Sequence, residues 1–183
     1  MRKINALLSA AIMLLFVIHA IIGTFQMTGI YSGGGIFSSA VSYGLIIFTL
    51  LHALIGVILT AKTVISAKKS GVFYIRENKK FLAVRLSGLA LMMLIFCHMM
   101  EFMGYVNSSG AFRLFVFDEA ALAVNILLVI SMLIHIILNV NPLLIALGAK
   151  RLKPYAPDIL FVISAVCFFG ALGFVIYYVR WLF

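Results

Sequence analysis

Acidic residues are scarce in this chain of 183 residues: Asp and Glu together number only five, and all charged residues make up 10%. Soluble domains usually carry about 25% charged residues. Apolar residues account for 65% of the sequence, and the mean hydropathy is +1.22. This composition excludes an ordinary soluble domain and indicates an integral membrane protein.

Cysteine is also scarce, with two residues in the whole chain. Cys97 and Cys167 lie inside apolar runs, where a disulfide framework has no purpose. The pattern Cys-x-x-Cys-His, which would attach haem covalently, is absent. We expect both cysteines to be small core residues.

Five apolar runs are long enough to span a membrane, since a spanning helix needs about 20 mostly apolar residues. Residues 1–24 resemble a signal peptide, but the apolar stretch is too long and no Ala-x-Ala site follows it, so we expect this helix to be retained. The sequence predicts an all-α bundle of five transmembrane helices forming a single domain over residues 1–183. The expected helices are approximately 5–27, 40–65, 81–104, 118–140 and 158–179.

Basic residues give the chain a formal net charge of +9. They fall between the apolar runs rather than in one basic domain, so we do not expect nucleic acid as a partner. By the positive-inside rule, the N-terminus is expected to be cytoplasmic and the C-terminus outside, in a multi-pass protein of the inner (cytoplasmic) cell membrane. The second connection mixes basic and aromatic residues, which suits the headgroups of the lipid bilayer or a docked soluble subunit. The residues on the expected cytoplasmic side are Arg2, Lys3, Lys62, Lys68, Lys69, Arg76, Lys79, Lys80, Arg85, Lys150, Arg151 and Lys153.

Four histidines, the only ones in the chain, lie one on each of the first four expected helices: His19, His52, His98 and His135. An ionisable side chain at membrane depth suggests function, because burying its polar atoms costs free energy unless a partner satisfies them. One such histidine could simply make a hydrogen bond between helices. Four, with almost nothing else polar to pair with, favour a bound group.

Single histidines on separate helices favour b-type haem over zinc or copper. Zinc and copper sites draw several ligands close together, often with Cys or carboxylate, and no such cluster occurs here. A haem iron with two axial imidazoles needs one ligand from each side of a flat ring, so four histidines predict two b-type haems. We expect each ligand to donate its other ring hydrogen to the carbonyl four residues earlier, which would fix its tautomer. Those carbonyls belong to Leu15, Phe48, Leu94 and Ser131.

Glycine follows two of the histidines by four residues, as Gly23 after His19 and Gly56 after His52. Residues i and i+4 share a helix face, so these glycines would leave hollows in which a porphyrin can approach the backbone. The alternative is that they are ordinary small-residue contacts between membrane helices.

The depth of each histidine predicts which of them share a haem. At about 1.5 Å per residue, His19 and His98 lie roughly 22 and 25 Å from the inner ends of their helices. His135 lies about 25 Å, and His52 about 15–20 Å, below the outer ends of theirs. We therefore pair His19 with His98 at an outer haem and His52 with His135 at an inner haem.

Several stretches resemble the diheme, five-helix cytochrome b subunit of succinate dehydrogenases and fumarate reductases. RLSGLALMMLIFCH, residues 85–98, resembles that family's Arg-x-Ser/Thr-Gly followed by an apolar run and His. LLHALIG, residues 50–56, is similar to its His-Ala-x-x-Gly, and LIHIILNVNPLLIALG, residues 133–148, resembles its His-x-x-Asn-Gly helix. In that last helix Asn139 comes one position late and no glycine follows it. The likeness extends from the first helix through the fourth.

The resemblance implies a membrane anchor for an iron–sulfur subunit and an FAD flavoprotein subunit on the cytoplasmic side, which interconvert succinate and fumarate in a respiratory chain. Electrons would pass between these subunits and a membrane quinone, menaquinone being favoured over ubiquinone. This chain would contain no dicarboxylate site. Arg85, beside Gly88, would be a haem-propionate partner, or else an arginine that snorkels to the interface.

One departure from the family concerns a glutamate two residues before the fourth ligand, which some members carry and which is Leu133 here. Glu101 lies on the His98 face at i+3 and is our candidate for proton exchange with quinone. Asp118 and Glu119 are expected only to cap the fourth helix.

Two other functions remain open. The first is a b-type cytochrome subunit of a membrane hydrogenase or formate dehydrogenase, although those usually place two ligands on one helix. The second is a proton-coupled transporter, which should show intramembrane carboxylates, broken helices and inverted repeats.

Overall fold

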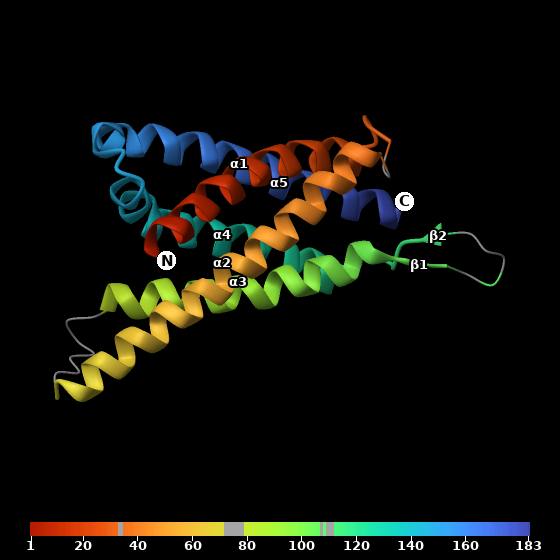
Figure 1. Cartoon of the computed structure of the whole chain (residues 1–183). Coiled ribbons are helices and arrows are strands. Elements are labelled where there is room, and N and C mark those ends of the chain that lie inside the picture. The colour runs from red at the N-terminus through yellow and green to blue at the C-terminus, as the bar shows by residue number, and fades with distance from the viewer. Residues whose placement is uncertain (33–34, 72–78, 107, 109–111) are drawn as a thin grey trace.

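Five long helices make up most of the chain in the computed structural model, which describes residues 1–32, 35–71, 79–106, 108 and 112–183 (Figure 1). They are α1 (Arg2–Met27), α2 (Ile36–Lys69), α3 (Lys79–Met103), α4 (Glu119–Ala146) and α5 (Ala156–Leu182). All five are long and apolar enough to cross a membrane, which indicates a multi-pass membrane protein. The all-α prediction and the five predicted helices are therefore confirmed.

Helix packing divides the molecule into two halves joined by α5. Helix α1 packs against α2 and α5, whereas α4 packs against α3 and α5, and α1 also touches α4. Over the described ranges, α2 and α3 share no substantial interface. In Figure 1, α2 crosses the bundle diagonally, and the N- and C-termini lie toward opposite ends.

Helix α4 continues through a proline that the sequence led us to place beyond its end. The expected helix ended at residue 140, yet α4 runs to Ala146 with Pro142 inside it. Proline cannot donate the usual hydrogen bond to the carbonyl four residues earlier. Leu144 and Val140 are nevertheless buried with Ala156 in a small core, and this packing holds the last turn of the helix in place.

Short elements connect the long helices. A two-stranded antiparallel hairpin follows α3, with β1 (Tyr105–Val106) paired to β2 (Phe112–Arg113) in the register Tyr105↔Arg113 and Val106↔Phe112. A 3₁₀ helix, η1 (Lys150–Tyr155), precedes α5, in which Pro157 and Asp158 occupy the first turn as expected. The second predicted connection lies partly outside the described residues, since 72–78, including Arg76, are not among them.

Arg180, near the end of α5, ties that helix to the end of α1. Its Nη1 donates to the carbonyl oxygen of Met27 at 3.0 Å. Gly29 lies beneath the guanidinium with φ +78, a conformation that favours glycine, and a side chain there would collide with Arg180.

The cysteines behave differently from each other. Cys167 is buried, as expected, whereas Cys97 is exposed on the outside of the bundle, so the prediction that it is a core residue is wrong. An apolar run gives a membrane helix no polar side by which its exposed face can be recognised from sequence.

Asp118 is the N-cap of α4, and its side chain accepts a hydrogen bond from the backbone N–H of Ala121 at 2.9 Å. Its predicted capping role is confirmed. We expect Asp118→Ala to lower the free energy of unfolding by about 1 kcal/mol, because a helix donor loses its partner. Equilibrium unfolding of the purified protein in detergent measures this, with Asp118→Asn as a control that keeps a capping oxygen. Equal losses in the two variants would contradict the capping role.

Candidate functional site

His19 of α1 and His98 of α3 come together between the two halves of the bundle. Their ring centres lie 6.3 Å apart, and the ring planes are inclined at 84°. The rings of Phe102 and Phe174 pack against His98, with ring centres at 5.0 and 6.0 Å. Depth along the helices had predicted that these two histidines would share a level.

His52 of α2 and His135 of α4 form the second pair. Their imidazoles lie close enough to interact electrostatically, and both also interact with the guanidinium of Arg85. Gly88 lies directly against His135, since a Cβ at this glycine would be 3.4 Å from Cε1 of the imidazole. Helix α3 thus presents bare backbone to the ring.

Each histidine uses its Nδ1 atom to contact a polar side chain of a neighbouring helix. Ser42 Oγ lies 3.3 Å from Nδ1 of His19, and Ser9 Oγ lies 3.1 Å from Nδ1 of His52. These two contacts join α1 to α2 in both directions. Helices α3 and α4 are joined in the same reciprocal way, by Ser87 with His135 at 3.0 Å and by Asn125 with His98 at 2.7 Å.

The hydrogens of the three serine hydroxyls are already used. Ser9, Ser42 and Ser87 donate to carbonyls of their own helices, those of Asn5, Ser38 and Val84, at 2.9–3.1 Å. A hydroxyl has one hydrogen, so each serine must accept from the imidazole. The amide oxygen of Asn125 can only accept. All four histidines are therefore held in the Nδ1–H tautomer, in which Nε2 carries the lone pair that binds a metal.

A regular spacing underlies this arrangement. Each helix carries one of these acceptors before its own histidine, ten residues earlier in α1, α2 and α4 and eleven residues earlier in α3. The acceptor bonds to the histidine of the neighbouring helix, not to that of its own helix. Ten residues of helix rise about 15 Å. Each helix thus supplies a histidine at one level and a hydrogen-bond acceptor for the other level. The pairs are Ser9 and His19, Ser42 and His52, Ser87 and His98, and Asn125 and His135.

The prediction that each Nδ1 atom bonds to the carbonyl four residues earlier in the same helix is wrong. The partners of Nδ1 are Ser9, Ser42, Ser87 and Asn125, and these side chains did not appear among the predicted site residues. A carbonyl inside a helix already accepts a bond from the backbone, whereas a serine on the adjacent helix has a free lone pair. Their spacing before each histidine was the available signal.

Open space surrounds the two glycines that follow histidines. A Cβ at Gly23 or Gly56 would meet nothing within 4 Å. Close helix contacts occur at other glycines, such as Gly173, where a Cβ would lie 3.1 Å from side-chain atoms of Thr24 and Met27. Gly23 and Gly56 therefore do not serve as small-residue contacts between helices, and they leave room beside the helix face that carries the histidine.

Two buried polar atoms without a hydrogen-bond partner occur in the described part of the chain, and one of them belongs to Arg85, which interacts with both imidazoles of the His52–His135 pair. They are Oδ1 of Asn5 and Nε of Arg85. The backbone carbonyl of Asn5 accepts a hydrogen bond from Ser9, the partner of His52, and the Arg85 guanidinium lies over the ring of Phe81, 5.0 Å from its centre. An unpaired buried guanidinium nitrogen is costly, so this position suits an anionic group of a ligand.

Glu101 joins the His19–His98 pair through Asn125. The amide nitrogen of Asn125 donates to Oε2 of Glu101 and also to the carbonyl of Ala121 at 2.8 Å. The amide oxygen accepts a hydrogen bond from Nδ1 of His98. Asn125 is fully buried, with 0% of its surface exposed. Glu119, in contrast, accepts a hydrogen bond from the hydroxyl of Tyr178 at 3.1 Å on the surface.

The histidines meet in pairs, and among the described residues no group of three or more His, Cys, Asp or Glu could hold a metal ion. With metal–nitrogen bonds of about 2.0–2.1 Å, two imidazoles on opposite sides of one metal have ring centres about 6.3 Å apart. The His19–His98 separation of 6.3 Å matches this value, and it also lies within the range of direct edge-to-face contact. The donor set, the glycine hollows and the unpaired Arg85 nitrogen all fit a flat, anionic macrocycle with two imidazole ligands.

The open space at Gly23 yields a prediction about stability. We expect Gly23→Leu to leave the thermal unfolding temperature of the ligand-free protein nearly unchanged, because its side chain enters empty space. Gly173→Leu should destabilise by about 1–3 kcal/mol through overpacking against Thr24 and Met27. Thermal unfolding in detergent compares the two variants. A loss at Gly23 as large as that at Gly173 would place Gly23 in a helix contact.

Comparison of this chain with protein-family models, with curated proteins and with solved structures finds no match. The geometry of the two histidine pairs is therefore the basis on which a function can be argued.

Proposed function

We propose that this protein is a diheme cytochrome b that carries electrons across a membrane. The proposal rests on the two histidine pairs, which lie at different heights along the bundle. In each pair the Nδ1 atoms are hydrogen-bonded to side chains of neighbouring helices, so the Nε2 atoms are left to bind a metal. Two b-type haems would each supply a one-electron carrier when bound. Their levels lie about 15 Å apart along the helices.

The residues of this chain would hold the two groups in different ways. His19 and His98 would be the axial ligands of one haem, with Gly23 giving room to the ring. His52 and His135 would be the ligands of the other, with Gly56 beside the ring. Gly88 supports this second site by letting α3 lie close to the ligand His135.

Arg85 would pair with a propionate of the haem at His52 and His135. Its buried, unpaired Nε atom and its position beside both imidazoles support this role over an arginine that only snorkels to the interface. A guanidinium gives planar, charge-assisted hydrogen bonds that a carboxylate matches well.

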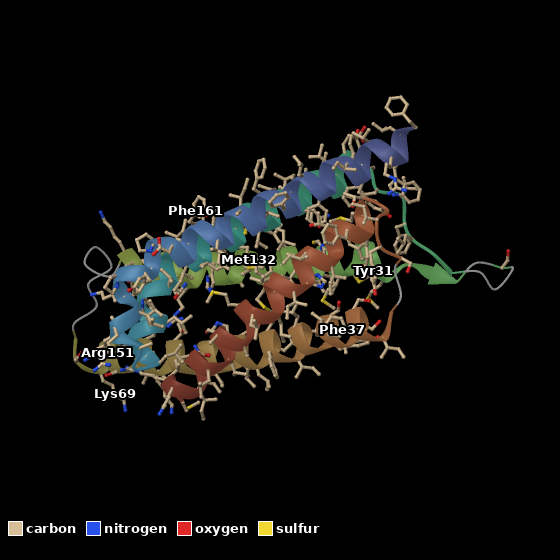
Figure 2. The ribbon with its side chains drawn as sticks, turned by 90° about the horizontal axis from the view of Figure 1, so that it is seen from above. Tyr31, Phe37, Lys69, Met132, Arg151 and Phe161 are labelled. Atoms are coloured by element: carbon tan, nitrogen blue, oxygen red, sulfur yellow. The ribbon has the colours of Figure 1, made fainter. Side chains whose placement is uncertain are left out.

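The basic residues would set the orientation, with the N-terminus in the cytoplasm and the C-terminus outside. Figure 2 labels Lys69 and Arg151 at one end of the bundle, with Tyr31 and Phe37 toward the other. Lys69 ends a 34-residue helix, about 51 Å long, that exceeds the roughly 30 Å hydrocarbon core. This basic end would face the cytoplasmic side of the inner cell membrane.

The resemblance to diheme anchors gives the proposed reaction. Electrons would pass between a membrane quinone, menaquinone or ubiquinone, and a cytoplasmic iron–sulfur subunit with its FAD flavoprotein, in succinate:quinone or quinol:fumarate oxidation and reduction. The basic end would supply the docking surface. The enzyme's dicarboxylate site would lie in the flavoprotein rather than in this chain.

Glu101 would exchange protons with quinone at the His19–His98 level. It is partly exposed, it lies one turn beyond His98 on α3, and one of its oxygens is already held by Asn125. The other oxygen is not bonded to Asn125 and can face the membrane. A carboxyl group fixed in this way can take up and release the protons that accompany two-electron quinone chemistry.

The haem content of the purified protein tests the proposal directly. We expect a reduced-minus-oxidised spectrum of b type with two haems per chain, and we expect His98→Ala and His135→Ala each to lose one haem, because each removes an axial ligand. Cys97→Ala, at an exposed position next to His98, is the matched control and should keep both. Haem that survives replacement of all four histidines would rule the assignment out.

A second measurement concerns Glu101. We expect Glu101→Gln to slow the oxidation of a menaquinol analogue about 10²-fold, because glutamine keeps the contact with Asn125 but cannot carry a proton. Glu119→Gln is the matched control, since Glu119 bonds to Tyr178 instead. Turnover of the whole complex, followed over a range of pH, distinguishes the two variants. A Glu101→Gln enzyme with wild-type rate and pH profile would assign proton exchange elsewhere.

A further inference from the structure

Asn125 is the only polar side chain that is fully buried in the described part of the bundle, with none of its surface exposed. It lies on α4, one turn after Ala121, and contacts α3 at two places. Burying an amide without partners costs free energy, and Asn125 is satisfied there by three hydrogen bonds. The bonds that Asn125 makes are directed at one histidine, one carboxyl group and one backbone carbonyl of its own helix.

The orientation of the Asn125 amide is determined by its neighbours. Its nitrogen faces two acceptors, the carbonyl of Ala121 and Oε2 of Glu101, and so uses both of its hydrogens. Its oxygen faces Nδ1 of His98 at 2.7 Å. The reverse orientation would place the amide oxygen against both of these acceptors. His98 must therefore donate to Asn125, and Asn125 must donate to Glu101.

This chain of bonds distinguishes His98 from the other three histidines. Their Nδ1 atoms contact serine hydroxyls, and each hydroxyl donates its hydrogen to a backbone carbonyl of the serine's own helix. The Nδ1–H of His98 instead meets an amide that leads to a carboxyl group. Hydrogen bonds in a row polarise one another, so an acceptor strengthened by Glu101 makes His98 a more electron-rich ligand.

We propose that Asn125 is the positioning residue of the His19–His98 site: it holds His98 in the Nδ1–H tautomer and couples Glu101 to this ligand. The inference deepens the proposed function and rests on it for the part that concerns haem. Asn125 is not itself one of the proposed haem ligands. It acts through His98 on the ligand side and through Glu101 on the side of proton exchange.

The tautomer can be tested without haem. In ¹⁵N NMR spectra of the ligand-free protein labelled at histidine, His98 should be at least about nine-tenths in the Nδ1–H form, corresponding to a bond worth about 1.4 kcal/mol or more. Asn125→Leu should mix the two tautomers of His98 and leave His135 unchanged. Ser87→Ala, which removes the partner of His135, is the matched control and should do the opposite. A His98 tautomer that is unaffected by Asn125→Leu overturns the proposal.

The coupling is tested on the haem-loaded protein by potentiometric titration and by haem content. Asn125→Leu should weaken binding of one haem by about 10–100-fold, the usual effect of losing a partner of a metal ligand. Because this variant could fail to fold, Asn125→Asp combined with Glu101→Gln exchanges donor and acceptor between the two positions and keeps an acceptor for His98. It should retain two haems and lower the midpoint potential of one of them, since a carboxylate partner favours the oxidised iron.

The outcomes separate the two proposals. A wild-type protein that binds no haem overturns the proposed function, while the NMR measurement still decides the role of Asn125. Suppose instead that the wild type binds two haems, and that haem content and both potentials are unchanged in Asn125→Leu and in the double variant with Asn125→Asp and Glu101→Gln. The proposed function then stands, and the coupling is overturned.

Discussion

The need to satisfy buried polar atoms in an apolar bundle governs the arrangement of this protein. Four imidazoles lie among helices that offer few other polar groups, and each ring carries two nitrogen atoms. One nitrogen of each ring is satisfied by a neighbouring helix, through Ser9, Ser42, Ser87 or Asn125. The same bonds fix the register of α1 against α2 and of α3 against α4, because a shift by one turn would leave both members of each pair without a partner.

The reciprocal pattern has a structural consequence. Helices α1 and α2 form one bonded unit, α3 and α4 form another, and α5 packs against both through α1 and α4. The histidines of each pair come from different units, so each pair bridges them. The absence of a substantial interface between α2 and α3 in the described residues leaves the units in contact mainly through α5 and the α1–α4 contact. A bound group held by two imidazoles would add a second connection between the units.

The sites at the two levels differ in the charges beside them. The His52–His135 pair faces the cationic Arg85, and the His19–His98 pair is linked through Asn125 to the acidic Glu101. A positive neighbour disfavours the oxidised state of an iron, and a negative one favours it. If two haems bind as proposed, they would therefore have different potentials, and these neighbours would favour one direction of electron transfer between them.

Much of the architecture was predictable from sequence because hydropathy along a membrane chain is a strong, local signal. The number of helices, the Asp118 cap and the first turn of α5 at Pro157 all follow from neighbouring residues. The continuation of α4 past Pro142 did not, since it depends on Val140 and Leu144 packing against α5. The exposure of Cys97 likewise depends on how α3 is rotated, which an apolar sequence does not reveal.

The sequence by itself determined that four histidines would lie within membrane helices and, through the rise of a helix, at which level each would be found. Tertiary structure alone decided which atoms meet: that Nδ1 of each histidine contacts a side chain across a helix interface, that Asn125 bridges His98 and Glu101, and that Gly23 and Gly56 face open space. The physical reason is that depth depends only on position along one helix. Contact depends on the rotation and spacing of two helices, which are set by the packing of the whole bundle.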